Sequence, residues 1–206
     1  MAQIPPSTRI HLVDDEGPFL ESLARLLRLK GLTVVTHSSA EEFLARSAGD
    51  DGACLVVDLN MPGLSGIELL EVLAETHPEL PVVFISGSAD VPSSVRAMKR
   101  GAVDFLTKPF EPEALLAAIE AALAQRARIR GERLRREESR QRLAQLTPRE
   151  RQVVERVAHG LLNKQIALEL GTSEHTVKVH RSNALSKLGV SSLPDLVRLV
   201  DQAGEP

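Results

Sequence analysis

Short apolar runs alternate with longer segments of helical periodicity over residues 1–119. Each run of strand length is followed by apolar residues spaced three and four positions apart, which is the pattern of a helix with one buried face. This alternation predicts a five-stranded parallel α/β sheet with helices packed on it. The predicted strand and helix pairs are Ile10–Val13 with Phe19–Leu29, Val34–Val35 with Glu41–Leu44, Leu55–Val57 with Ile67–Leu73, Val82–Ile85 with Val95–Met98, and Phe105–Leu106 with Leu115–Leu123.

Capping residues mark where some of these helices begin and end. Ser39 with Glu42, and Ser65 with Glu68, have the spacing of a capping box, which predicts the starts of the second and third helices. Gly31 predicts the end of the first helix, because glycine readily adopts the left-handed conformation that closes a helix.

Residues 146–206 carry no strand pattern and are predicted to form four short helices. Thr147-Pro148-Arg149-Glu150 begins the first, with an N-cap hydroxyl, proline at the first helical position and glutamate three residues after the cap. Asn163 is predicted to cap the second helix, Gly171-Thr172-Ser173 to turn into the third, and Ser192 to open the fourth. Two helices joined by a glycine-containing turn predict a helix-turn-helix, a unit that binds duplex DNA.

A charged segment joins the two parts of the chain. It lacks proline and places opposite charges four residues apart, for example at Glu132 and Arg136, which predicts a solvated helical linker. A coiled-coil stalk is the alternative, but no large apolar residue lies between Leu134 and Leu143, so sustained heptads are absent. The predicted organisation is an α/β domain over residues 1–123, a linker over 124–145 and an all-α domain over 146–206.

Composition narrows the class of protein. Hydrophobic residues make up 43% and charged residues 26% of the 206, which is typical of globular domains. No apolar stretch reaches the roughly 18 residues of a membrane span, and residues 1–9 lack the apolar region of a signal peptide, so we expect a cytoplasmic protein with no membrane partner. The single Cys54 lies in an apolar run and is predicted to pack as an inert thiol.

Charge is unevenly distributed along the chain. Residues 1–119 carry a net charge of −8, residues 120–145 of +4 and residues 146–206 of +1. The first part is therefore expected to repel DNA, and the last part to bind it weakly as a single copy. With no Trp or Tyr to stack on unpaired bases, the nucleic acid is expected to be duplex.

Polar residues follow four of the predicted strands at their carboxyl ends, where parallel sheets bind ligands. Three are carboxylates, which repel one another when close together and so require a cation; oxygen ligands suit Mg²⁺. The alternative is that these aspartates are unrelated caps and turn residues. The residues in question are Asp14, Asp15, Asp58, Ser86, Thr107 and Lys108.

These motifs resemble the receiver domain of bacterial two-component response regulators over residues 9 to about 123. The resemblance rests on Val13-Asp14-Asp15, the segment from Val57 to Gly66, Phe84-Ile85-Ser86-Gly87, and the segment from Gly101 to Phe110. It implies a flavodoxin-like fold in which Asp58 accepts a phosphoryl group from a sensor histidine kinase. Mg²⁺ would be held by Asp14, Asp15, Asp58 and the Asn60 carbonyl, and the phosphoryl oxygens would be contacted by Lys108 and Ser86.

The resemblance also implies how phosphorylation is transmitted. Phe105 would be the switch residue on the fifth strand, and Lys108-Pro109 would form a cis peptide. Relatives of the FixJ type pair through the face of the fourth helix, here Val91, Val95, Met98 and Lys99, so phosphorylation is expected to promote a homodimer. One departure from such relatives is Ser88-Ala89 in place of His-Gly, which bears on the lifetime of the acyl phosphate.

The C-terminal segment resembles the LuxR-type helix-turn-helix. The matching residues are Leu146-Thr147-Pro148-Arg149-Glu150, Gly160, the segment from Asn163 to Ala167, the segment from Thr176 to His180, and Lys187-Leu188. The resemblance implies sequence-specific binding to promoter DNA, with RNA polymerase as a further possible partner. Lys178, Val179 and the neighbouring His180, Arg181 and Ser182 would face the major groove, and Lys164, Thr176 and Lys187 would hold the DNA backbone.

Two further interpretations remain beside that of a response regulator controlling transcription. A magnesium-dependent phosphohydrolase would use Asp58 as its nucleophile, but phosphatases of the haloacid dehalogenase type carry an acidic residue two positions later, where this chain has Asn60. A constitutive DNA-binding protein would leave the acidic site without a role. We therefore expect no enzymatic activity beyond magnesium-dependent autophosphorylation from a donor and slow autodephosphorylation.

Overall fold

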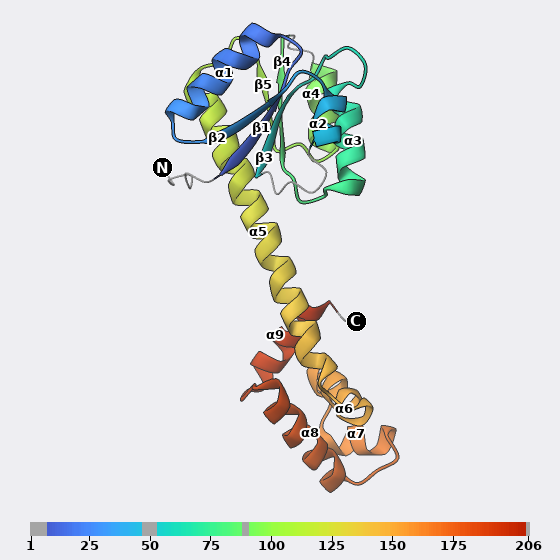
Figure 1. The fold of residues 1–206 in the computed structure, drawn as a ribbon. Helices are drawn as coiled ribbons and strands as arrows, with labels where there is room; N and C mark the ends of the chain where they lie inside the picture. The colour runs from blue at the N-terminus through green and yellow to red at the C-terminus, as the bar shows by residue number, and fades with distance from the viewer. Residues whose placement is uncertain (1–7, 47–52, 88–90, 205–206) are drawn as a thin grey trace. The chain divides into compact units, whose positions relative to one another are not determined.

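A computed structural model describes residues 8–46, 53–87 and 91–204 (Figure 1). The chain divides into two compact units, residues 1–129 and 130–206. The point of division lies inside the segment predicted to be the linker. Among the described residues, no helix is both long enough and apolar enough to cross a membrane.

The N-terminal unit contains a five-stranded sheet in the order β2-β1-β3-β4-β5, and every neighbouring pair of strands is parallel. The predicted five pairs of strand and helix are confirmed. The strands are β1 (Arg9–Val13), β2 (Thr33–His37), β3 (Cys54–Asp58), β4 (Val82–Ser86) and β5 (Asp104–Thr107), and the helices are α1 (Gly17–Leu29), α2 (Ala40–Arg46), α3 (Gly66–Thr76), α4 (Val91–Lys99) and α5 (Pro112–Ala144).

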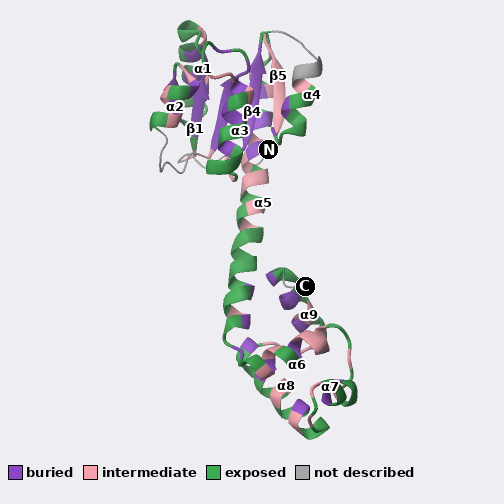
Figure 2. Ribbon diagram, turned by 90° about the vertical axis from the view of Figure 1, so that its right-hand side faces the viewer, coloured by how far each residue is buried: buried purple, intermediate pink, exposed green. Residues whose placement is uncertain are grey.

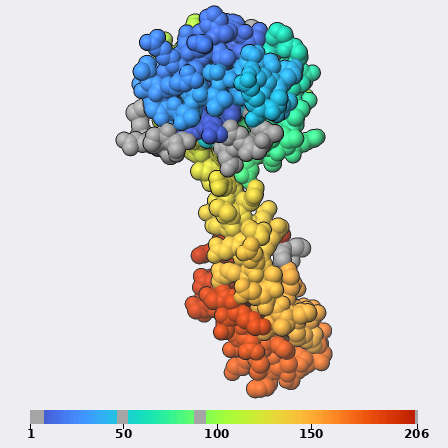
Figure 3. Space-filling view, in the orientation of Figure 1, coloured from blue at the N-terminus to red at the C-terminus, as the bar shows by residue number. Residues whose placement is uncertain are grey.

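Helices cover both faces of this sheet (Figures 1 and 2). Successive strand residues point to opposite faces, so Val56 packs with α1 and α5 whereas Leu55 and Val57 pack with α2, α3 and α4. All five residues of β3 are buried, as expected for a central strand covered on two sides. Cys54 is fully buried and burial raises its pKa to about 12, so its thiol is inert. Figure 3 shows the unit from the side that includes α1 and α2.

The strand order brings β1 and β3 together at the centre of the sheet. From β1 the chain crosses to β2 on one side, and from β3 it crosses to β4 on the other. Connections that leave in opposite directions open a crevice at the carboxyl ends of these two strands. Asp14 and Asp58 are therefore placed at the position where such sheets bind ligands.

The two predicted capping boxes differ in the structure. Ser65 and Glu68 form the full reciprocal box at the start of α3, as predicted. Ser39 accepts a hydrogen bond from the Glu42 amide at 3.1 Å, but the Glu42 carboxylate is bonded to the Ser38 amide and hydroxyl instead of the Ser39 amide. The second box is thus shared between two adjacent serines.

The C-terminal unit is all helical and has a core of its own. The cap predicted at Thr147 is confirmed, with Pro148 at the first helical position and Glu150 completing the box. Ser173 and Ser192 cap the last two helices through their hydroxyls. The helices are α6 (Pro148–Ala158), α7 (Asn163–Glu169), α8 (Glu174–Leu188) and α9 (Leu193–Ala203).

The predicted cap at Asn163 is wrong. Asn163 is the first residue of α7, and the preceding Leu162 amide donates to the Gln165 side chain at 2.8 Å. The Asn163 side-chain oxygen instead accepts a hydrogen bond from Arg181 at 3.3 Å. A tertiary partner therefore replaces the local one that the sequence suggested.

α5 extends through the predicted linker as a helix of 33 residues. Its beginning contributes Leu115 and Ile119 to the sheet core, and its end contributes the buried Leu143 to the C-terminal core. Near this end Arg140 Nε donates to the Ala203 carbonyl at 3.0 Å, and Arg142 donates to the Leu188 carbonyl. The helical character predicted for the linker is confirmed, but its last turns belong to the C-terminal core.

Candidate functional site

Three of the predicted site residues meet at the carboxyl edge of the sheet. Asp14 follows β1, Asp58 ends β3 and Lys108 follows β5. Lys108 Nζ lies 2.8 Å from Asp14 Oδ2 and 2.9 Å from Asp58 Oδ1. The side chains of both aspartates are buried and that of Lys108 is largely so. Strands distant in sequence thus bring two carboxylates onto one ammonium group.

Backbone groups fix the orientation of these side chains. The other oxygen of Asp14 accepts a hydrogen bond from the Glu16 amide at 2.8 Å, and that of Asp58 from the Asn60 amide at 2.7 Å. The Lys108 amide donates to the Ser86 carbonyl at 2.7 Å, and the Lys108-Pro109 peptide is cis. Each carboxylate is therefore held at one oxygen by the backbone and at the other by Lys108.

Ser86 and Asn60 also belong to this site. Ser86 is fully buried at the end of β4, and Asn60 Nδ2 lies 3.4 Å from its hydroxyl oxygen. Gly66 makes the close packing around Asp58 possible, because a Cβ there would lie 2.5 Å from the Asp58 carbonyl oxygen and 2.9 Å from the Phe84 ring. The backbone that carries Asp58 is thus closely supported from behind.

Burial and charge act against each other on the central pair. Burial raises the pKa of Asp58, and the nearby Asp14 raises it further, whereas hydrogen bonds from Lys108 and the Asn60 amide lower it; the net pKa is raised. Burial lowers the pKa of Lys108, but its hydrogen bonds to Asp14 and Asp58 outweigh burial and the net pKa is raised. The site holds a charged lysine between two carboxylates that repel each other.

The donor chemistry of this pair suits Mg²⁺, because both aspartates offer hard oxygen ligands and their mutual repulsion favours a cation. Asp15, the third carboxylate of the prediction, is exposed, and the described residues contain no cluster of three or more Asp, Glu, His or Cys side chains that could hold a metal. In the structure Lys108 lies between Asp14 and Asp58 as their counter-charge.

Phe105 lies on β5, half-buried against the core that contains its strand neighbour Phe84. On the adjacent α4, Val95 and Met98 are 45% and 47% exposed. Ser88 and Ala89, which stand where FixJ-type relatives have His-Gly, lie outside the described residues, and the Val91 side chain is likewise not described. α4 therefore presents apolar side chains to the surface beside the strand that carries the predicted switch residue.

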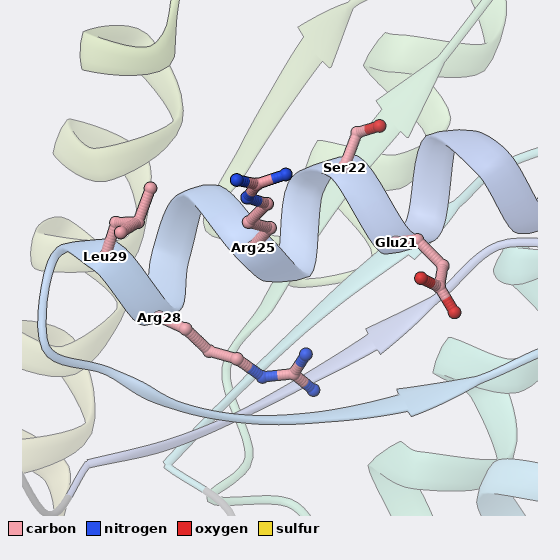
Figure 4. Close-up of a pocket in the computed structure, with 5 residues that line it drawn as sticks. All are labelled: Glu21, Ser22, Arg25, Arg28 and Leu29. Atoms are coloured by element: carbon pink, nitrogen blue, oxygen red, sulfur yellow. The ribbon is translucent and has the colours of Figure 1, made fainter.

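α1 also borders a hollow in the N-terminal unit (Figure 4). Arg28, one of its lining residues, donates to the Val34 carbonyl at 3.1 Å and so ties the helix to β2. The lining mixes one acidic and two basic side chains and includes no residue of the predicted site. The lining residues are Glu21, Ser22, Arg25, Arg28 and Leu29.

The exposed face of α8 carries part of the predicted DNA-binding set. Lys178 and Val179 are exposed, whereas His180 and Arg181 are half-buried. Asn183, which the sequence analysis did not single out, is exposed on the same helix and offers both a donor and an acceptor. Lys164 is exposed on α7, and the Thr176 hydroxyl lies 2.8 Å from the Ser173 hydroxyl at the start of α8.

Lys187 has a partner that the sequence analysis missed. Its Nζ donates to Glu150 Oε2 at 2.7 Å, and the same carboxylate oxygen accepts a hydrogen bond from the Thr147 amide at 2.8 Å. These bonds from Lys187 and Thr147 lower the pKa of Glu150 to about 2. The ammonium that was predicted to hold the DNA backbone is therefore bonded within the domain, where it joins α8 to the start of α6.

Two families match the chain. The response regulator receiver domain matches residues 10–120, and the luxR family of bacterial regulatory proteins matches residues 144–200. The transcriptional regulatory protein FixJ of Azorhizobium caulinodans is 44% identical over 201 residues, which are 98% of this chain and 95% of that protein. The chain is a response regulator of the FixJ/NarL family.

This response regulator is also 45% identical to the response regulator protein TodT of Pseudomonas putida, over 94% of the chain and 85% of TodT. Among solved structures it is similar to the response regulator StyR, with a TM-score of 0.79, 46% identity and coverage of 95% and 99% of the two chains. Full-length FixJ from B. japonicum gives a TM-score of 0.60 and 41% identity, with coverage of 96% and 97%.

The pairing of domains decides the general role of this response regulator. A receiver followed by a LuxR-type helix-turn-helix makes it a DNA-binding regulator of transcription, and control by phosphorylation is typical of its family. Receiver domains generally bind Mg²⁺ at their acidic pocket and receive their signal from a sensor kinase. The predicted fold class and family are confirmed.

Proposed function

We propose that Asp58 accepts a phosphoryl group from a sensor histidine kinase and that this event controls binding of the C-terminal unit to duplex promoter DNA. The observation that carries the proposal is the contact of Lys108 with both Asp14 and Asp58 at the carboxyl edge of the sheet. It supports a site built to hold concentrated negative charge, which a phosphoryl group increases by roughly 1.5 to 2 charges.

The residues support an in-line displacement at phosphorus. An Asp58 carboxylate oxygen forms the new O–P bond while the N–P bond of the phosphohistidine breaks, and the imidazole leaves with the electron pair and takes up a proton. Lys108 then donates to a phosphoryl oxygen in place of the Asp58 oxygen, and the Ser86 hydroxyl donates to another. Bound Mg²⁺ would neutralise charge on the phosphoryl oxygens, and Asp14, Asp15, Asp58 and the Asn60 carbonyl would hold it.

A change at Ser86 would reach the surface through β4 and β5. Drawing the Ser86 hydroxyl toward the phosphate leaves space that the Phe105 ring fills by packing, since Phe105 has no hydroxyl of its own. The neighbouring face of α4, with Val95 and Met98 exposed, then pairs with the same face of a second copy. A dimer links two DNA-binding units and raises their effective concentration at a site with two half-sites.

On DNA, the exposed face of α8 would lie in the major groove. Lys178 and Val179 contact base edges, His180 and Arg181 lie beside them, and Lys164 and Thr176 hold the phosphate backbone. Lys187 contacts DNA in this arrangement only if its ammonium donates to a phosphate as well as to Glu150, or to a phosphate in place of Glu150. The DNA-bound dimer would contact RNA polymerase at the promoter.

Asp58→Asn tests the acceptor. With acetyl phosphate and Mg²⁺, we expect the unaltered protein to gain one acid-labile phosphate and Asp58→Asn to gain none, whereas Asp104→Asn on β5 serves as a matched control and labels normally. DNA footprinting of the same three proteins then reports the coupling: the donor increases protection by the two that label. Undiminished labelling of Asp58→Asn would move the acceptor elsewhere, and steady turnover of small phosphoesters would indicate a phosphohydrolase.

A further inference from the structure

Lys108 has a third contact beside the two carboxylates. Its Nζ lies 4.1 Å from the centroid of the Phe19 ring, while Asp14 and Asp58 lie at 2.8 and 2.9 Å. A cation over the face of an aromatic ring is attracted by the ring's negative face. The ammonium is thus held by two carboxylates and one ring face, and the ring comes from α1.

A second aromatic residue supports the Phe19 ring. Phe110 meets it edge to face, with centroids 6.2 Å apart and ring planes at 87°. Both rings are half-buried and pack against the same core of the sheet. Because Phe110 follows Lys108 by two residues, the segment that carries the lysine also fixes the ring that lies against its ammonium.

The phosphoryl transfer explains why a third contact matters. Lysine has a flexible stem and a compact charge, so its ammonium position depends on what it touches. When Asp58 acquires a phosphoryl group, the Lys108 bond to its carboxylate oxygen is replaced by a bond to a phosphoryl oxygen. The contacts to Asp14 and Phe19 need not change, and they can hold the ammonium in place during the exchange.

We propose that Phe19 is a positioning residue for phosphoryl transfer, acting through Lys108. This inference rests on the proposed phosphorylation of Asp58. The ring face keeps the ammonium directed at the oxygens of the reacting centre and excludes water from one side of it. Phe19 forms no bond to the phosphoryl group, so its contribution lies in the electrostatic attraction between ring and cation.

Fluorinated phenylalanines at position 19 separate that attraction from packing. Each added fluorine withdraws electron density from the ring face and weakens cation binding with little change in shape. With acetyl phosphate and Mg²⁺, we expect the rate of Asp58 labelling to fall step by step along the mono-, di- and trifluoro series, by about two- to fivefold overall. The same series at Phe43, a buried ring of the same unit, is the matched control and leaves the rate unchanged.

A proton NMR measurement tests the geometry without any reaction. Protons above a ring face resonate upfield, so the ε-methylene protons of Lys108 are expected upfield in the unaltered protein and near their ordinary position in Phe19→Leu. Phe110→Leu is expected to give an intermediate shift, because it removes the support of the Phe19 ring and leaves the ring itself.

The outcomes distinguish this inference from the proposed function. Labelling of the unaltered protein at Asp58, together with equal rates along the fluorinated series at position 19, would overturn the role of Phe19 and leave the acceptor intact. A Lys108 ε-methylene signal at its ordinary position in the unaltered protein would independently overturn the role of Phe19. Labelling that persists in Asp58→Asn would instead overturn the proposed function.

Discussion

Asp58 and Glu150 are both buried carboxylates that accept a hydrogen bond from a lysine, yet their pKa values move in opposite directions. Burial and the charge of Asp14 raise the pKa of Asp58, which shares Lys108 with that second carboxylate. Glu150 takes the Lys187 bond alone and also accepts the Thr147 amide, so its pKa falls to about 2. The site at Asp58 therefore still favours an added positive charge, whereas the carboxylate of Glu150 is paired with Lys187 and stabilises the contact between α6 and α8.

The depressed pKa of Glu150 predicts a dependence of stability on pH. Its carboxylate is more acidic in the folded protein than the ordinary value of 4.5, so its stabilisation is complete above about pH 4.5 and is lost as pH falls toward 2. We expect Lys187→Met to lower the free energy of unfolding of the C-terminal unit by about 1.5 to 3 kcal/mol at pH 7. The difference between the variant and the unaltered protein is expected to shrink as the pH falls from about 4.5 toward 2.

Urea unfolding of the full chain at a series of pH values measures this difference. Arg156→Met is the control, because the Arg156 pair with Glu169 is more exposed and is expected to be worth less than about 1 kcal/mol. A destabilisation by Lys187→Met that stays constant between pH 7 and pH 2 would contradict the assigned role of Glu150.

At the scale of elements, α8 carries two kinds of basic residue. Lys178 is exposed, whereas Arg181 is half-buried and donates to Asn163 at the start of α7. α8 is also fixed at its C-terminal end, through Lys187, to the start of α6. The helix that is expected to enter the major groove is therefore held by tertiary contacts on one side and free for DNA on the other.

This division predicts different effects for two alanine substitutions. Lys178→Ala is expected to weaken operator binding by at least about 1 kcal/mol and to change the free energy of unfolding by less than about 0.5 kcal/mol. Arg181→Ala is expected to weaken binding by a similar amount and to destabilise the unit as well, because it removes the bond to Asn163. Fluorescence anisotropy with labelled duplex and urea unfolding supply the two measurements.

Arg198→Ala removes a positive charge from the exposed surface of α9 and is the charge-matched control. It is expected to bind DNA with nearly unchanged affinity. Unaltered affinity in Lys178→Ala would instead relocate the DNA-reading surface away from this face of α8.

At the scale of the whole molecule, charge separates the two roles. The net charge of −8 over residues 1–119 favours binding of a cation and opposes contact with DNA, while +1 over residues 146–206 is low for a DNA-binding unit. A single copy is therefore expected to bind weakly. Joining two copies raises affinity without any new contact to DNA.

Sedimentation velocity tests whether phosphorylation supplies that second copy. We expect the protein to shift from monomer toward dimer on addition of acetyl phosphate and Mg²⁺, and Val95→Asp on α4 to prevent the shift by placing a charge in the apolar contact. Val72→Asp on α3, where the side chain is 37% exposed, is the matched control and dimerises normally. An identical mass with and without the donor would refute the phosphorylation-dependent dimer.

Local patterns in the sequence determined most of the elements and one part of the site. The strands and helices followed from apolar periodicity, and the caps at Ser65, Thr147 and Ser192 were predicted from neighbouring residues. Asp14, Asp58 and Lys108 could be expected to converge, because the carboxyl ends of parallel strands lie at one edge of a sheet. Such features depend on residues close in the chain or on the general geometry of a sheet.

Tertiary packing decided which partner three other polar side chains found. Asn163 bonds Arg181 instead of capping α7, Lys187 bonds Glu150, and Lys108 lies over the Phe19 ring. These contacts join elements whose separation and orientation follow from how their cores pack. The periodicity of apolar side chains along the chain does not predict that separation or orientation. The sequence by itself therefore determined the fold, the domain order and the family, and the three-dimensional structure decided which charges are held between the elements and which stay exposed for a ligand.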